Sequence, residues 1–179
     1  ATVLHGVTLG VYNLMFSLHI EGVGMSGAVL GTALAFGVAV EIGVMAFSPA
    51  MFRRLGLLVP LVVGIASGAP RWWLTAVTDD PTVMVLAQGL HGIGFGAWWM
   101  ASVAVLTEHA PREIRNATQA LLPATSHGAA NLIALGCAAV LLDSMGTVGL
   151  MKAMTGFSLA ATIVVAWAAV RGRHVLTER

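Results

Sequence analysis

Six long apolar stretches constrain this chain more than any other feature of its sequence. Each has roughly 18–28 residues, and about 20 apolar residues carry an α-helix across a bilayer. Only 9% of the 179 residues are charged, against about 25% in a soluble domain, so the surface cannot be that of a soluble globule. We therefore expect an all-α membrane protein with spans at residues 1–18, 27–48, 55–77, 83–107, 114–142 and 147–170.

The links between these stretches are short, so consecutive spans are predicted to be antiparallel neighbours in one six-helix bundle. Basic residues fall in the second link, the fourth link and the C-terminal tail, whereas acidic residues fall in the other three links. Basic residues collect on the cytoplasmic side of a membrane, so both termini are predicted to be cytoplasmic. The basic set is Arg53, Arg54, Arg112, Arg115, Arg171, Arg173 and Arg179, and the acidic set is Glu21, Asp79, Asp80 and Asp143.

A short internal repeat relates the first span to the fourth. His5-Gly6 and His91-Gly92 are each followed by a glycine four residues after the first and by an aromatic residue two further on, at an offset of 86 residues. Two copies of a three-helix unit would have opposite orientations, as in many secondary transporters. We therefore expect a 3+3 inverted repeat. The Gly6/Gly10 and Gly92/Gly96 pairs also indicate close helix packing.

Two ionisable side chains lie well inside predicted spans, Arg71 in the third and His91 in the fourth. An arginine near the bilayer centre costs roughly 2.5–3.5 kcal/mol on insertion scales, and such residues usually mark a functional site. At about 1.5 Å per residue, both lie about 9–12 Å from an outer end, within reach of one water or ligand. A structural ion pair is the alternative for Arg71, and Trp72 and Trp73 are either interfacial anchors or a cavity wall beside it.

One face of the fourth span mixes polar and aromatic groups at three- and four-residue spacing. Such a mixture is typical of a small-molecule cavity, although a satisfied interior histidine beside a packing stripe would look the same. The face comprises Gln88, His91, Phe95, Trp98 and Ser102.

Glu41 is the only acidic residue deep in a span, and a carboxyl group removed from water can carry a proton near neutral pH. The alternative is a carboxylate bonded to a helix backbone or to a basic group. Gly37 and Gly43 on either side suggest close packing around it.

Other spans extend the candidate set. His127 and Asn131 are one turn apart in span five, where Pro123 can break the helix, and Tyr12 lies in span one. Their alternative role is hydrogen bonding between helices, worth about 0.6 kcal/mol on average. There is no phosphate loop, nucleophile-base set or metal-ligand spacing, so we predict no enzyme, no cofactor and no metal.

Four motifs extend over spans two to five: Glu41 followed by residues 47–56, then Arg71, then residues 88–96, then residues 108–119. Together they resemble the C-terminal half of major facilitator superfamily permeases, most nearly the group of lactose permease, nucleoside-proton symporters and phenylpropionate permease.

The resemblance implies twelve spans in two six-helix halves, with substrate bound between the halves. It also implies that Arg71 and His91 match an arginine and a histidine used in proton coupling and substrate binding. The sequence differs from lactose permease one turn on either side of this histidine, where Gln88 replaces a lysine and Gly94 replaces an essential carboxylate.

Two functions follow as alternatives. The first is half of a proton-linked secondary transporter for a small polar or anionic organic solute. In this function Glu41 and His91 take part in proton coupling, and the binding residues are Arg71, His91, Gln88, Trp98, His127, Asn131 and Tyr12. The second is a non-transporting subunit of a larger membrane complex. We expect a location in the bacterial inner membrane and no nucleic-acid partner. A second six-helix unit should cover the site: a missing N-terminal half, a homodimer mate or another membrane protein.

Overall fold

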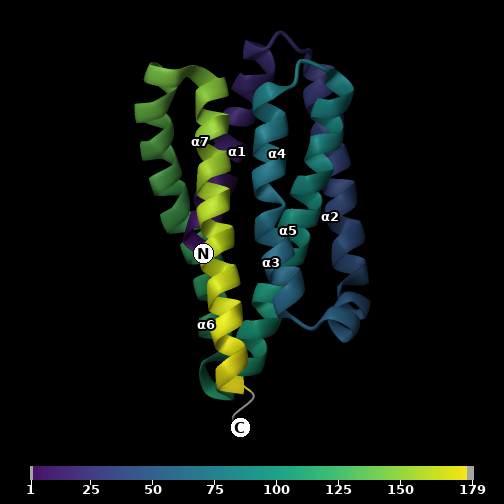
Figure 1. Cartoon of the computed structure of the whole chain (residues 1–179), viewed down its shortest axis with the longest axis vertical. Helices are drawn as coiled ribbons and strands as arrows, with labels where there is room; N and C mark the ends of the chain where they lie inside the picture. Colours follow the sequence, from purple (N-terminus) through teal and green to yellow (C-terminus); the bar gives the residue numbers. More distant parts are fainter. Residues whose placement is uncertain (1, 177–179) are drawn as a thin grey trace.

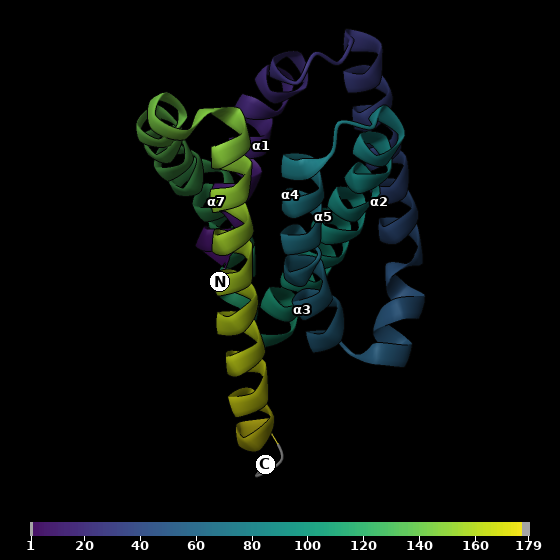
Figure 2. The same cartoon turned by 45° about the horizontal axis from the view of Figure 1, so that its top comes forward.

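Helices account for almost all of the residues that the structure, a computed structural model, describes. Residues 2–176 are described, with side chains to Arg171. Outside this part lie Ala1, which bounds the first predicted span, and both Arg179 and the side chain of Arg173, which belong to the sorted basic set. The helices run along one long axis (Figures 1 and 2). They are α1 (Thr2–Gly22), α2 (Gly27–Leu55), α3 (Leu58–Ala66), α4 (Gly68–Val77), α5 (Pro81–His109), α6 (Arg115–Pro123) and α7 (Ala130–Leu176).

Four helical runs are long and apolar enough to cross a membrane. They are Thr2–Gly22, Gly27–Leu55, Pro81–His109 and the continuous run Arg112–Arg171. The first of these is mostly buried inside the molecule and the second is mostly exposed. The prediction of an all-helical fold with membrane-spanning helices is therefore confirmed, and α1 lies near the centre with α2 at the edge.

The third predicted span is divided into two short helices. α3 ends at Ala66 and α4 begins at Gly68. Pro70 explains the interruption, because it has no N–H for the carbonyl of Ala66 and its ring conflicts with that carbonyl. The Ser67 hydroxyl donates to the Gly64 carbonyl oxygen at 2.8 Å across the break. Arg71 therefore lies in a separate segment of ten residues, α4.

The fifth and sixth predicted spans share the run that begins at Arg112. After the short 3₁₀ turn η1 (Arg112–Ile114), α6 leads into a π-helical segment, η2 (Ala124–Ala129), and then into α7. α7 contains one non-helical residue, Gly146, with φ 66° and ψ −176°, a backbone conformation that glycine adopts without steric cost. Here the chain reverses, so that the two parts of α7 lie antiparallel (Figure 1).

The links gather at two ends of the bundle. The α1–α2 link, the α4–α5 link and the reversal in α7 lie at one end, whereas the α2–α3 link, the α5–α6 link and the end of α7 lie at the other (Figure 1). The acidic residues of the sorted set belong to the first end and the described basic residues to the second. Glu21 and Asp143 lie in helices rather than in links.

Both glycine pairs lie at close helix contacts, as predicted. A Cβ on Gly6 would lie 2.5 Å from the Ser126 carbonyl oxygen, and one on Gly10 would lie 2.5 Å from Asn131 Oδ1. A Cβ on Gly92 would lie 2.7 Å from the backbone nitrogen of Glu41. The first pair thus joins α1 to η2 and α7, and the second joins α5 to α2.

We expect Gly92→Ala to lower the stability of the folded protein by about 1–3 kcal/mol, because the added methyl group would overlap the backbone of α2 and overpacking has this cost. Gly43→Ala is a matched control, since nothing lies within 4 Å of a Cβ there and alanine favours a helix by up to about 1 kcal/mol. Thermal unfolding in detergent would measure both. A Gly92→Ala protein as stable as Gly43→Ala would show that α2 and α5 are not in this contact. The close packing predicted around Glu41 is found at Gly37 but not at Gly43. A Cβ on Gly37 would lie 3.2 Å from the Gln88 carbonyl oxygen.

Candidate functional site

A polar cavity of about 220 Å³ opens on the bundle where α1, α2, α5 and η2 meet. Two of its six lining residues, Leu9 and Phe95, are apolar. The other four bring a carboxyl group, an amide and two imidazoles together. They are Asn13, Glu41, His91 and His127. Three of these four polar residues, Glu41, His91 and His127, belong to the predicted site.

Glu41 reaches the cavity from the middle of α2. The backbone there lies against Gly92 and Gly96 of α5: a Cβ on Gly96 would lie 3.3 Å from the Glu41 carbonyl oxygen. This close approach is possible because neither glycine has a side chain. The glycine pair of α5 thus holds the carboxyl-bearing turn of α2 beside the helix that carries His91.

His127 lies in the π-helical segment that follows Pro123. Its ring lies edge-on to Phe95 and Trp99, with centroid distances of 6.2 and 5.7 Å. Ser126 donates its hydroxyl proton to the Leu122 carbonyl oxygen at 2.7 Å. The 3.0 Å contact between Ser126 Oγ and His127 Nδ1 must therefore use the proton on Nδ1. This tautomer leaves the lone pair of Nε2 free to accept a hydrogen bond.

His91, Tyr12 and Arg71 form a stack beneath the cavity. The Tyr12 ring lies 4.6 Å from the His91 ring and 4.2 Å from Arg71 Cζ. The structure therefore brings Arg71 and His91 together through Tyr12, as their similar depths predicted. Cation–π contacts of this kind contribute about 2 kcal/mol when they are removed from water.

Every contact of Arg71 in this stack is with an uncharged group. Its Nε donates to Gln88 Oε1 at 3.2 Å, and Gln88 in turn donates to the Met84 carbonyl oxygen at 3.3 Å. Trp72 covers the other side, 4.4 Å from Cζ, and the Arg71 side chain is only 3% exposed. Trp72 is thus a wall beside Arg71, whereas Trp73 is half exposed, consistent with a position at the lipid surface.

Other predicted binding residues lie away from the cavity wall. Gln88 and Trp98 are completely buried. Gln88 lies between Arg71 of α4 and Gly37 of α2, whereas Trp98 lies against Gly64 of α3 and the His5 ring, 4.8 Å away. Asn131 lies against Gly10 of α1 and does not line the cavity that His127 lines.

Sequence reasoning missed His19, which joins three segments at the acidic end. Its Nε2 donates to the Thr75 carbonyl oxygen of α4 at 2.8 Å, so Nδ1 accepts from the Thr147 hydroxyl at 3.1 Å. α4 ends at Val77, so the Thr75 carbonyl is among the last four that lack a partner within the helix. His19 therefore caps α4 from α1, two turns beyond the Tyr12–Arg71 contact between the same helices.

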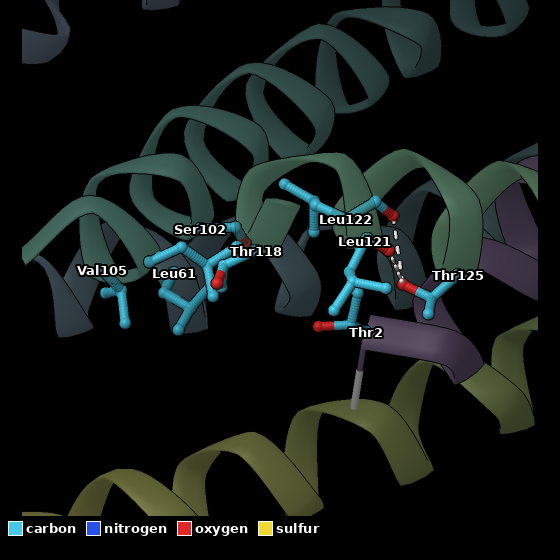
Figure 3. A pocket seen from close by; sticks show the side chains of 9 residues that line it. Thr2, Leu61, Ser102, Val105, Thr118, Leu121, Leu122 and Thr125 are labelled. Atoms are coloured by element: carbon cyan, nitrogen blue, oxygen red, sulfur yellow. Dashed lines mark hydrogen bonds between the residues drawn. The ribbon is translucent and has the colours of Figure 1, made fainter. Parts of the chain in front are cut away.

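A second cavity, of about 300 Å³, lies among the first turn of α1, α3, α5 and α6 (Figure 3). Leucine and valine side chains dominate it. Thr125 donates its hydroxyl to the Leu121 carbonyl oxygen at 2.7 Å, and Thr118 donates to Ile114 at 3.0 Å. Ser102, predicted on the same face as His91, lines this cavity instead. The hydroxyl protons of Thr118 and Thr125 are used within the helical run that carries them, and the cavity holds no carboxyl, amide or imidazole group, so it offers a polar solute less than the first cavity.

Among the described residues, no group of three or more His, Cys, Asp or Glu side chains could hold a metal ion. The two cavity histidines instead contact aromatic rings and Ser126. The cavity thus offers groups that accept and donate hydrogen bonds to a small polar molecule.

Comparison with protein families matches residues 1–153 to the MFS_1 like family. Comparison with curated proteins finds no match. The family match covers most of the chain and agrees with the apolar helices long enough to span a bilayer. The chain therefore belongs to the MFS_1 like family, and it is an integral membrane protein of transporter type.

Proposed function

We propose that the chain forms half of a proton-linked secondary transporter that moves a small polar or anionic organic solute by alternating access. The observation that supports this function is the cavity in which Asn13, Glu41, His91 and His127 converge from four segments. A few convergent polar groups on apolar walls are typical of small-molecule sites. Nothing in the cavity favours the alternative of a non-transporting subunit.

Within this function, Glu41 carries the coupled proton and exchanges it with the cavity. His91 and His127 orient the solute, and His127 accepts a hydrogen bond from it through Nε2. Arg71 attracts the negative charge of the solute from beneath His91. Because its present partners are all uncharged, Arg71 has the charge to offer an anion once the stack opens during the transport cycle. Tyr12 and Gln88 hold the guanidinium group in place until then.

We further propose that the six predicted passes form two inverted three-helix units. The glycine contacts support this arrangement through their reciprocity. The Gly6/Gly10 pair of the first pass contacts the fifth, and the equivalent Gly92/Gly96 pair of the fourth pass contacts the second. If a two-fold axis relates residues 1–77 to residues 83–170, the first pass corresponds to the fourth and the second to the fifth. A contact between passes one and five must then be matched by one between passes four and two, and the glycine pairs make both contacts.

A second six-helix unit is proposed to complete the cavity. Its volume of about 220 Å³ is below the roughly 300–1,000 Å³ of ligand pockets, and Asn13 on its rim is exposed. A covering unit would enclose the solute and keep the polar rim out of lipid. By the basic-residue rule, the end that carries Arg53 and Arg112 is cytoplasmic, in a bacterial inner membrane.

The function predicts solute-dependent proton uptake. Membrane vesicles from cells that make the chain together with the unit that covers its cavity, loaded with a pH-sensitive dye, should acidify inside when a sugar, nucleoside or aryl carboxylate that the protein transports is added outside. Vesicles without the protein are the control. If a panel covering all three solute classes moves no protons and no solute enters, the transport proposal is wrong and a subunit role gains support.

A labelling experiment tests the hydrated cavity without knowledge of the solute. In a Cys137→Ser background, Asn13→Cys should react with a charged, membrane-impermeant methanethiosulfonate at least 10-fold faster than Ile163→Cys. Ile163 is 68% exposed on the second part of α7, where lipid would shield a thiol. Asp79→Cys should react only from outside the cell. Equal rates at positions 13 and 163, or reaction of Asp79→Cys only from the cytoplasm, would contradict the assignment.

A further inference from the structure

A second polar space lies behind the open cavity. It is a small void of about 10 Å³ between α1, the α3–α4 break and α5. His91 lines both this void and the open cavity, so its ring forms a wall between them. The other residues around the void that carry polar side-chain atoms are His5, Thr8, Ser67, Arg71 and Trp72.

The void borders polar atoms that lack hydrogen-bond partners. Both ring nitrogens of His5 and Nη2 of Arg71 are buried and have no partner within the described part of the chain. Each of these side chains is 3% exposed. A buried polar atom without a partner costs about 1–3 kcal/mol, and more if it is charged. Trp72 Nε1 on the same void is also buried without a partner, and three such residues on one small space indicate a missing bridging group between them.

The size of the void limits that group to one small molecule. A site needs roughly 10–15 Å³ of this kind of space to hold one water, and water enters where two to four polar partners are present. Voids that stay dry are lined by apolar side chains, which is not the case here.

The hydroxyl groups of Thr8 and Ser67 favour water over an anion as the molecule that occupies the void. Thr8 donates its proton to the His5 carbonyl oxygen at 2.7 Å, and Ser67 donates to the Gly64 carbonyl oxygen at 2.8 Å. Both hydroxyls can therefore offer the void only lone pairs. An anion could accept from Arg71 and Trp72 but would face these lone pairs, whereas a water molecule can accept from Arg71 or Trp72 and also donate to the lone pairs of Thr8, Ser67 or a neutral His5.

We propose that this void is a hydration site in which one ordered water accepts a hydrogen bond from Arg71 Nη2 and donates one to a ring nitrogen of His5. His5 is thereby a positioning residue for Arg71, since the water would hold Nη2 while Gln88 holds Nε and the guanidinium group lies over the Tyr12 ring. The two histidines related by the sequence repeat, His5 and His91, thus lie on one water-sized space. This role deepens the proposed function at Arg71, but the site itself does not depend on transport.

The test is a high-resolution structure of the solute-free protein in lipid nanodiscs or crystals. A density peak should lie about 2.7–3.2 Å from both Arg71 Nη2 and a His5 ring nitrogen. The peak should persist in His127→Phe, which changes only the open cavity, and should disappear in His5→Phe, which keeps an aromatic ring against Trp98. No peak in the wild-type protein, at a resolution that shows other buried waters, would overturn the site.

Two further arms keep the result decisive. Crystals grown in bromide should give no anomalous signal at the void, and a signal would replace the water by an anion. A peak that persists in His5→Phe would remove His5 from the site. If His5→Phe does not fold, the wild-type and bromide arms still decide. Because no solute is added, a failed transport assay would leave these outcomes unaffected.

Discussion

Arg71→Ala is expected to lower solute-dependent proton uptake at least 100-fold, which corresponds to about 2.7 kcal/mol in the transport barrier. The guanidinium group is the charge on which the proposed solute site depends, and alanine removes its contacts with Tyr12, Trp72 and Gln88 together. The measurement is initial uptake by vesicles with matched amounts of folded protein, using the solute that gives the largest signal in the wild-type panel.

Two variants separate this effect from general damage. Trp73→Ala changes the next residue of α4, but its side chain is 52% exposed and lies outside the stack, so uptake should change by no more than about 2-fold. Arg71→Lys keeps the charge but loses the planar group that lies over Tyr12, and we expect it to fall between the two. Equal losses in Arg71→Ala and Trp73→Ala would assign Arg71 a structural role only.

The second large effect is expected at Glu41. Glu41→Gln keeps the shape of the side chain but cannot carry a proton, so accumulation of solute against its gradient should be abolished. Exchange of labelled for unlabelled solute should continue, because it requires no net proton movement. The two assays together test the coupling role rather than solute binding. Full uphill transport in Glu41→Gln would remove this carboxyl group from the mechanism.

A carboxyl group at the end of the bundle, away from the cavity, provides a matched control for Glu41. Asp79→Asn removes an exposed acidic residue of the α4–α5 link and should leave uphill accumulation within about 2-fold of wild type. Loss of accumulation in both variants would point to a general effect of charge rather than to proton transfer at Glu41.

The helical fold was predictable because apolar runs with few charges have one solution in lipid: backbone groups must be satisfied within helices. The glycine contacts were also predictable, since Gly6, Gly10, Gly92 and Gly96 follow a spacing that places small residues on one face. The break at Ser67 was not predicted, although Pro70 was visible in the sequence, because a proline within a span is often tolerated with a kink.

The site was predictable as a set of residue types, but not as a set of contacts. Arg71, Gln88 and His91 were each candidates, yet the Arg71–Gln88 hydrogen bond depends on how α4 meets α5. His19 was missed because its two partners, Thr75 and Thr147, lie 56 and 128 residues away. His5 was seen only as part of a repeat, since the sequence gives no sign that its ring nitrogens face Arg71.

The π-helical segment also affects how this chain can be aligned with its relatives. A π-helical turn, with its i→i+5 hydrogen bonds, contains one residue more than an α-helical turn. Since an α-helix turns by about 100° per residue, this extra residue changes the direction of the side chains that follow it. Everything from Ala130 onward is rotated accordingly relative to Arg115–Pro123. A relative in which the pass equivalent to residues 115–142 is an uninterrupted α-helix should therefore need a one-residue gap opposite residues 124–129. Without that gap, Asn131 and Ala134 would be aligned with residues on a different side of the helix.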